Sequence, residues 1–167
     1  MGATDVAAAS RDGRQALVEA LRHVGVRERP PESNRTMFGR WFGVDGVPWC
    51  AIFVSYCFSV GAGVTLCRGW HGAGVYPRGV AYVPTLEAWL RATGREVPAW
   101  SAPAPGDVAV FDWDGGLPDH VGIVIAAHAG GVLETVEGNT AVGNDSDGGA
   151  VMRRRRRGSQ VSTFGRL

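Results

Sequence analysis

The sequence predicts an α+β domain in which N-terminal helices pack on a C-terminal antiparallel sheet. Helical patterns occupy the first half of the chain, and short apolar segments separated by Gly- and Asp-rich turns follow from residue 101. The 25 glycines among 167 residues argue for many turns and strands rather than a helical bundle. Helices that precede a run of strands are typical of the α+β class, in which the sheet packs against the helices.

Length and composition indicate one globular domain. We expect a flexible tail at residues 1–11 and a single domain at residues 12–167, which is long enough to bury a core. A net charge of +1 gives no reason to expect nucleic acid or a membrane as partner, and three cysteines do not indicate a disulfide framework. We find neither a membrane-spanning segment nor the features of a signal peptide.

Two helices are expected before the middle of the chain. Apolar residues recur with helical spacing over residues 12–24, and Asp12 is the expected capping residue. After two consecutive prolines, a short helix is expected over residues 36–42, capped by Ser33 or Asn34.

A buried helix over residues 49–60 is the expected centre of the domain. This stretch of apolar and small residues is too long for a typical strand, and it is apolar on all sides. Cys50 lies in its first turn, where unpaired N–H groups and the helix dipole favour a thiolate. Cys50 is therefore the candidate nucleophile. The alternative is that it only packs in the core, as buried cysteines usually do.

The segment after this helix is expected to be irregular. Residues 62–84 are rich in glycine and aromatic residues, which either line a groove or cover the core. An amphipathic helix is expected over residues 85–93.

Five strand candidates follow. They are Val108–Trp113, His120–His128, Gly131–Glu137, Gly149–Arg157 and Val161–Gly165. Because close turns separate them, we expect an antiparallel meander.

A cysteine nucleophile needs a histidine base, and His120 is the best placed of the four histidines. It opens a strand directly after a turn, so its side chain can point out of the end of the sheet. The apolar residues 121–127 would hold it rigidly. His128 lies at the other end of the same strand, about 26 Å away at about 3.3 Å per residue. Only one of the two can face Cys50.

The next strand offers the group that orients the histidine. Residues 137 and 139 share one face if the strand continues that far. A carboxylate can hold the imidazole and stabilise its charged form, so Glu137 is the first choice and Asn139 a supporting polar residue. The alternative is that Glu137-Gly138-Asn139 is only a turn.

Four motifs occur in order along the chain: Pro48-Trp49-Cys50-Ala51, Pro105-Gly106-Asp107-Val108-Ala109-Val110-Phe111, Asp119-His120-Val121-Gly122-Ile123-Val124 and Glu137-Gly138-Asn139. Together they resemble the CHAP family, the cysteine- and histidine-dependent amidohydrolases/peptidases of phage lysins and bacterial wall enzymes. The resemblance covers about residues 12–166.

The resemblance implies a papain-like α+β fold and a peptidoglycan hydrolase. The bond cleaved would be an amide of the wall peptide, cut by an endopeptidase or an N-acetylmuramoyl-L-alanine amidase. Cys50 would be the nucleophile, His120 the base, and Glu137 with Asn139 would complete the site. No cofactor is expected. The expected partner is the wall peptide, and the protein would reach the wall through phage delivery, a holin or another export route, with a phage structural or delivery protein as a further partner.

Two other polar stretches need separate explanations. Some relatives carry a calcium loop before the cysteine, but Glu32, Asn34 and Asp45 are too few oxygen ligands at regular spacing, so no metal is expected. Residues 144–148 are expected to form a hairpin turn. The basic run over residues 153–157 either binds an anionic polymer or protects an edge strand; the second interpretation is preferred because the net charge is small.

Two other functions stay open. The chain could be a non-catalytic structural or binding part of a phage tail or secretion machine that retains the fold. It could also be a papain-like toxin that cleaves another amide, because the same motifs are compatible with hydrolysis of a wall peptide and with hydrolysis of another amide substrate.

Overall fold

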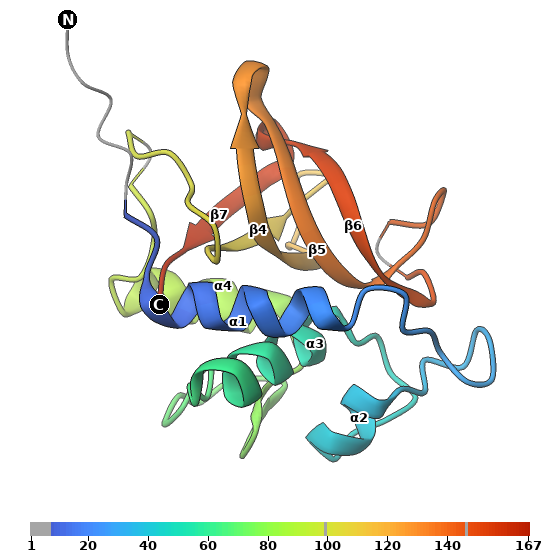
Figure 1. Ribbon diagram of the computed structural model, residues 1–167. Coiled ribbons are helices and arrows are strands. Elements are labelled where there is room, and N and C mark those ends of the chain that lie inside the picture. The colour runs from blue at the N-terminus through green and yellow to red at the C-terminus, as the bar shows by residue number, and fades with distance from the viewer. Residues whose placement is uncertain (1–7, 99, 146) are drawn as a thin grey trace, which may run out of the picture.

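A five-stranded antiparallel sheet packs on a layer of helices (Figure 1), which confirms the expected α+β fold. The computed structural model describes residues 8–98, 100–145 and 147–167. Residues 1–7, most of the expected tail, lie outside the described residues. In the part that is described, no helix has both the length and the apolar character needed to cross a bilayer.

The sheet contains, in chain order, β3 (Val108–Phe111), β4 (His120–His128), β5 (Val132–Thr140), β6 (Ala150–Arg157) and β7 (Val161–Gly165). Their spatial order is β6-β5-β4-β3-β7, and all neighbours are antiparallel. Short turns at Ala129–Gly131 (η2) and Gly158–Gln160 (η3) connect β4 to β5 and β6 to β7. The meander is therefore confirmed, with β7 returning to the free side of β3, so that β6 and β7 form the two edges.

The expected strand bounds are confirmed for β4 and β7, while β5 extends further than expected. It continues beyond Glu137 to Thr140, because Thr140 still pairs with Ala150 of β6 after an irregularity in the ladder. That irregularity lies next to the proposed catalytic residues.

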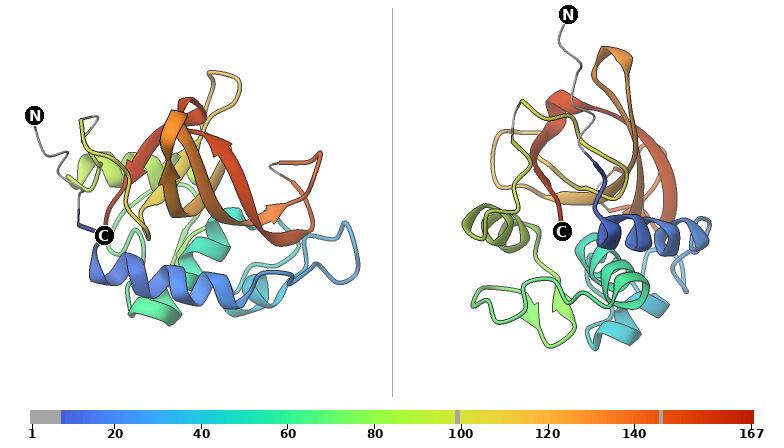
Figure 2. Two further views of the ribbon diagram at one scale, coloured as in Figure 1. Left: turned by 45° about the horizontal axis from the view of Figure 1, so that its top comes forward. Right: turned by 60° about the vertical axis from the view of Figure 1, so that its left-hand side comes forward.

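Four α-helices form the other layer: α1 (Arg11–Arg22), α2 (Met37–Phe42), α3 (Cys50–Tyr56) and α4 (Val83–Ala92). α3 continues directly as a wider π-helical turn, η1 (Cys57–Gly61). In the views of Figure 2, α1 and α3 lie side by side beneath the sheet. The expected central helix is thus confirmed, and it ends at the glycine that the sequence indicates.

The expected capping residues of α1 and α2 are wrong. Ser10, not Asp12, caps α1 by accepting a 2.9 Å hydrogen bond from the N–H of Gly13. Thr36, rather than either earlier candidate, caps α2 by accepting a 3.1 Å bond from the N–H of Gly39. In both helices the cap is the hydroxyl directly before the first helical residue, as the geometry of the first turn requires.

α3 lies in the centre of the core, where Ala51, Ile52, Phe53 and Val54 are fully buried. It contacts α2 on one side and the strands β4 and β5 on the other. The segment before α4 contains a small hairpin that the sequence does not predict, with strands β1 (Val75–Tyr76) and β2 (Gly79–Val80). Ser55 of α3 fixes this hairpin, since its hydroxyl donates to the carbonyl of Val80 and accepts from the N–H of the same residue. Two-residue strands are too short to show an alternating pattern.

Candidate active site

Cys50 is the first residue of α3, at the position that the sequence indicates. The N–H of Phe53 donates to the carbonyl of Trp49 at 2.8 Å and closes the first helical turn around Cys50. The indole of Trp49 is itself fixed, because its Nε1–H donates a 2.9 Å hydrogen bond to Glu28. Cys50 is 4% exposed and lines a cavity of about 540 Å³, so its sulfur lies at the boundary between core and solvent.

His120 is the first residue of β4 and is fully buried. Its ring lies against the aromatic rings of Trp113 and Phe111, at centroid distances of 5.4 and 6.0 Å. Its Nε2–H donates a 2.9 Å hydrogen bond to Oε2 of Glu137. The other ring nitrogen, Nδ1, makes no hydrogen bond of ordinary geometry with any described residue, which leaves it available to the Cys50 thiol.

The charge of His120 depends on two neighbours. Burial by itself lowers the pKa of this histidine, because it disfavours the charged ring. Interactions with the Cys50 thiol and with the Glu137 carboxylate more than offset burial and raise the pKa to about 9. The ring is therefore an imidazolium at neutral pH, beside the sulfur that is the candidate nucleophile.

Glu137 is fully buried and accepts hydrogen bonds at both oxygens. Besides His120, it binds the Thr135 hydroxyl at 2.6 Å and Nε and Nη2 of Arg156 at 2.9 and 2.5 Å. Burial raises the pKa of this carboxyl, but the bonds from Arg156 and His120 outweigh burial and bring the pKa to about 2. Glu137 is thus a carboxylate, and the interpretation of this stretch as only a turn is wrong because residue 137 lies within β5.

Arg156 is the residue of the site that the sequence reasoning missed. Its side chain is 5% exposed, bonds Glu137, reaches Asp145 at 2.8 Å and lies 5.3 Å over the ring of Trp113. The basic run is therefore not a uniformly solvated face, although β6 is an edge strand as expected. The period of two in a strand could have separated residue 156, which shares a face with Thr135 and Glu137 across the ladder, from its exposed neighbours.

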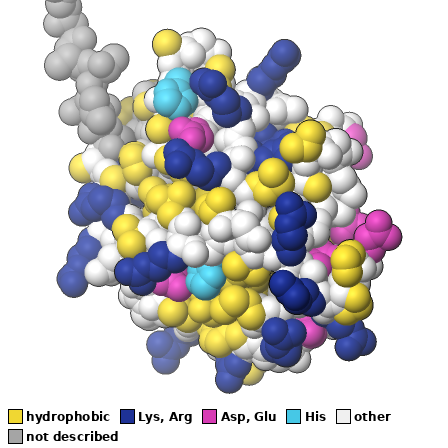
Figure 3. All heavy atoms as spheres, turned by 45° about the vertical axis from the view of Figure 1, so that its right-hand side comes forward, with side chains coloured by type: hydrophobic (Ala, Val, Ile, Leu, Met, Phe, Trp, Pro, Cys, Tyr) yellow, Lys and Arg dark blue, Asp and Glu magenta, His cyan; other side chains and the backbone are white. Residues whose placement is uncertain are grey.

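The remaining arginines of the run have other partners or point to solvent. Arg153 pairs with Glu134 at 2.6 Å on the surface, and Arg154 pairs with Asp145. On the face shown in Figure 3, arginine side chains are dispersed among apolar and acidic ones rather than gathered into one basic surface. This distribution favours edge protection over polymer binding.

Asn139 lies at the irregular end of β5 and is fully buried. Its φ of 58° is left-handed, and the pairing with β6 shifts register between Glu137 and Thr140, so the expected simple alternation of residues 137 and 139 is wrong. Gly138 allows this segment to approach the start of α3, because a Cβ there would lie 2.7 Å from the Cβ of Phe53. The structure therefore brings Glu137 and Asn139 to the same end of the core as Cys50.

The other histidines and cysteines do not belong to this cluster. His128 lies at the far end of β4 and pairs with Glu134 at 3.6 Å, while His23 bonds Glu19 at 2.9 Å on α1. Cys57 and Cys67 are buried free thiols, and burial raises the pKa of Cys67 to about 12. Of the groups that the sequence offered, His120 and Glu137 are hydrogen-bonded to each other, and the Cys50 thiol is near enough to His120 to help raise its pKa.

The cavity beside Cys50 is largely apolar. Its walls come from the segments on both sides of β1 and β2, from the approach to α3 and from the turn before β4: Val44, Val47, Pro48, Ala73, Gly74, Tyr76, Ala81, Tyr82, Val83, Pro84, Leu117, Pro118 and Asp119. Both interpretations of the irregular segment are therefore correct in part: Tyr76 and Tyr82 line the groove, whereas Trp70 packs against the core. The groove is open to solvent, and Cys50 is one of the residues that line it.

Comparison with known proteins gives a family match and a structural match. The CHAP domain model matches residues 42–139, a range that contains Cys50, His120, Glu137 and Asn139. Similar solved structures include the crystal structure of Ly7917 and that of Ly7917 with the hydrolyzing product of MDP, at 18% and 19% identity and TM-scores of 0.49 and 0.50. Each alignment covers 91% of this chain and 61% of the other, so the chain spans less than two thirds of those proteins. No curated protein matches the chain significantly.

Proposed function

Because the family model matches more than half of the chain, the protein belongs to the CHAP domain family, and from this premise we propose that it hydrolyses an amide bond of the peptidoglycan peptide. The bond lies either within the peptide or between N-acetylmuramic acid and L-alanine. The observation that carries the proposal is the buried contact network of Cys50, His120 and Glu137. The structure of Ly7917 with the hydrolyzing product of MDP adds a protein of similar fold that holds a hydrolysis product.

In the proposed reaction, the Cys50 thiolate attacks the amide carbonyl and forms a tetrahedral intermediate. The His120 imidazolium then protonates the departing amine, which leaves a thioester on the sulfur and a neutral imidazole. Neutral His120 next takes a proton from water, and the attack of that water on the thioester releases the acid and expels the sulfur as a thiolate, which restores the thiolate–imidazolium pair. Atoms and protons balance over the two steps, and no cofactor takes part.

The surrounding groups support both steps. Glu137 stays ionised through its bonds to Arg156, so it can orient His120 and stabilise the imidazolium. The backbone N–H of Cys50, in the first helical turn, is the proposed donor to the oxyanion. The wall peptide would lie in the apolar groove that Cys50 helps to line.

Loss of turbidity in purified sacculi tests this proposal. Cys50→Ala should abolish lysis, because burial raises the pKa values of the Cys57 and Cys67 thiols and neither can replace Cys50 as a thiolate nucleophile. Cys57→Ala is the matched control, since it removes a buried thiol one element further along and should retain lysis. Undiminished lysis by Cys50→Ala would rule out the enzyme. Mass spectrometry of the released fragments then separates the two bonds, because an endopeptidase creates new peptide N-termini and an amidase leaves free lactyl ends.

A further inference from the structure

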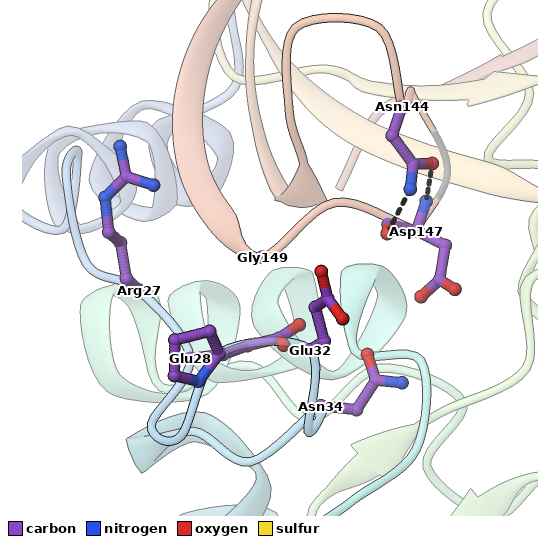
Figure 4. Close-up of a pocket in the computed structure, with 8 residues that line it drawn as sticks. Arg27, Glu28, Glu32, Asn34, Asn144, Asp147 and Gly149 are labelled. Carbon is purple, nitrogen blue, oxygen red and sulfur yellow. Dashed lines mark hydrogen bonds between the residues drawn. The ribbon is translucent and has the colours of Figure 1, made fainter.

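A second cavity, of about 450 Å³, lies between the loop that follows α1 and the loop that joins β5 to β6 (Figure 4). Three carboxylates line it: Glu28 and Glu32 from the first loop, and Asp147 from the second. Asn34 adds an amide to the same wall. None of these groups belongs to the network around Cys50.

Glu28 is the strongest sign that this cavity binds a ligand. Its side chain is 5% exposed, and Oε1 accepts a hydrogen bond from the indole of Trp49, but Oε2 has no partner among the described residues. The buried Oδ1 of Asn34 likewise has no partner in the described part of the chain. Two buried oxygens without donors are costly, so a donor that enters the cavity would be bound favourably. Gly149 leaves room there, because even a Cβ at this position would lie 3.5 Å from Oε2.

The cavity has an uncompensated negative charge. No described residue forms an ion pair with Glu28, Glu32 or Asp147, and only Arg27 brings a positive charge to the wall. In Figure 4 the Arg27 guanidinium points away from the carboxylate of Glu32. Within the second loop, Asn144 donates to the backbone carbonyl of Asp147 at 2.7 Å and accepts from its N–H, as Figure 4 shows.

The size of the cavity and the spacing of its acids favour an organic cation. Among the described residues, no three acidic, histidine or cysteine side chains come close enough to hold a metal ion. The volume is also many times the roughly 30 Å³ share of one water molecule. A primary ammonium group on a flexible stem has three N–H donors and suits several separate oxygen acceptors.

The cavity adjoins the active site through two contacts. Trp49, which bonds Glu28, directly precedes Cys50 in the chain. On the other wall, the N–H of Gly148 donates a 2.9 Å bond to the carbonyl of Asn139. Through Trp49 and Asn139, the walls of this anionic cavity are therefore joined to the residues around Cys50.

We propose that this cavity binds the free primary ammonium group of a basic residue in the wall peptide. This inference rests on the proposed function and deepens it. It assigns to the enzyme a preference for wall peptides in which the side-chain amine of the basic residue is free. Acetylating that amine removes the charge and two donors, so an acetylated peptide loses the interaction.

A binding experiment tests the inference independently of catalysis. The probe is Nα-acetyl-lysine amide, and its Nε-acetyl derivative is the neutral control. The signal is the indole N–H resonance of Trp49 in ¹H–¹⁵N spectra, because this group bonds the same carboxylate as the proposed ligand. We expect a saturable shift with the charged probe and none with the neutral one. The double variant Glu32→Gln/Asp147→Asn, at two exposed positions, should weaken binding about tenfold or more, while Glu96→Gln, a partly exposed acid near β7, should not change it.

Equal shifts with both probes, or unchanged binding by the double variant, would overturn the inference. Saturation by Ca²⁺ alone, with exclusion of the charged probe, would also overturn it in favour of a metal site. If the protein binds the probe but does not hydrolyse sacculi, the cation site is supported and the proposed function is contradicted. If both hold, the double variant should raise KM for wall peptides whose side-chain amine is free and leave KM for acetylated peptides unchanged.

Discussion

Nε2 of His120 and Oε2 of Glu137 lie 2.9 Å apart, and both side chains are fully buried. Arg156 bonds the same carboxylate from the other side. The Arg156 guanidinium, the Glu137 carboxylate and the His120 imidazolium therefore form a row of alternating charge beside Cys50. Such a buried row is stable only while every member keeps its partner. Its energetics therefore link the stability of the protein to its proposed activity.

Glu137→Gln should move the alkaline limit of hydrolysis to lower pH. The His120 pKa of about 9 owes part of its elevation to the charge of Glu137, which an amide lacks. In the wild type, kcat/KM should fall as pH rises through about 9, because the imidazolium loses its proton. In the variant the fall should begin about one pH unit or more lower, with a lower maximum. Kinetics on soluble wall fragments measure both, and an unchanged alkaline limit would contradict the role of Glu137.

The same pair sets a window of maximal stability. Glu137, whose pKa falls from 4.5 to about 2 on folding, contributes stability that is present above pH 4.5 and lost as pH falls through about 2. His120, raised from 6.5 to about 9, contributes stability that is present below pH 6.5 and lost as pH rises through about 9. Urea unfolding should therefore show both contributions in full between pH 4.5 and 6.5. The acid loss should be smaller in Glu137→Gln, and an identical acid profile would disagree with this assignment.

Arg156→Gln should destabilise the fold far more than Arg153→Gln. The first change leaves the buried Glu137 without its strongest charge partner, which costs about 3–5 kcal/mol for a broken buried pair. The second removes a pair whose arginine is 55% exposed, worth about 1 kcal/mol or less. Denaturant unfolding of the two variants measures the difference, and equal values would show that residue 156 is only a surface charge.

Iodoacetamide should label Cys50 alone in the folded protein. Burial raises the pKa of Cys67 to about 12 and that of Cys57 well above its usual value, so neither forms a thiolate at neutral pH. Cys50 borders the groove and lies beside a charged histidine. Peptide mapping should find one modified cysteine, and label on Cys67 before Cys50 would contradict the structure.

Asn139→Gly and Asn139→Ala separate the backbone from the side chain. Glycine adopts the left-handed φ of 58° freely, whereas alanine costs about 1 kcal/mol there. If the amide group serves the reaction, both variants lose hydrolysis, and the alanine variant loses more thermal stability than the glycine variant because it also carries the backbone strain. Full activity of Asn139→Gly would limit this residue to a backbone role.

The amino-acid sequence alone determined the features that depend on neighbouring residues. The apolar stretch after Pro48 indicated the central helix and placed Cys50 in its first turn, and the apolar run over residues 121–127 between two histidines indicated β4 with its bounds. The order of motifs likewise indicated the family. These signals are readable because helical and strand periodicities arise from the local backbone.

Only the tertiary structure decided which side chains share a proton, a charge or a cavity. The burial of Arg156 depends on the register between β5 and β6. That register shifts between Glu137 and Thr140, and the residues Glu137-Gly138-Asn139 alone do not predict the shift. The acidic cavity likewise joins loops more than a hundred residues apart in the chain. Sequence periodicity predicts the face of a helix or strand on which a side chain lies. Its burial and its pairing energy depend on which residues from distant parts of the chain pack against that face.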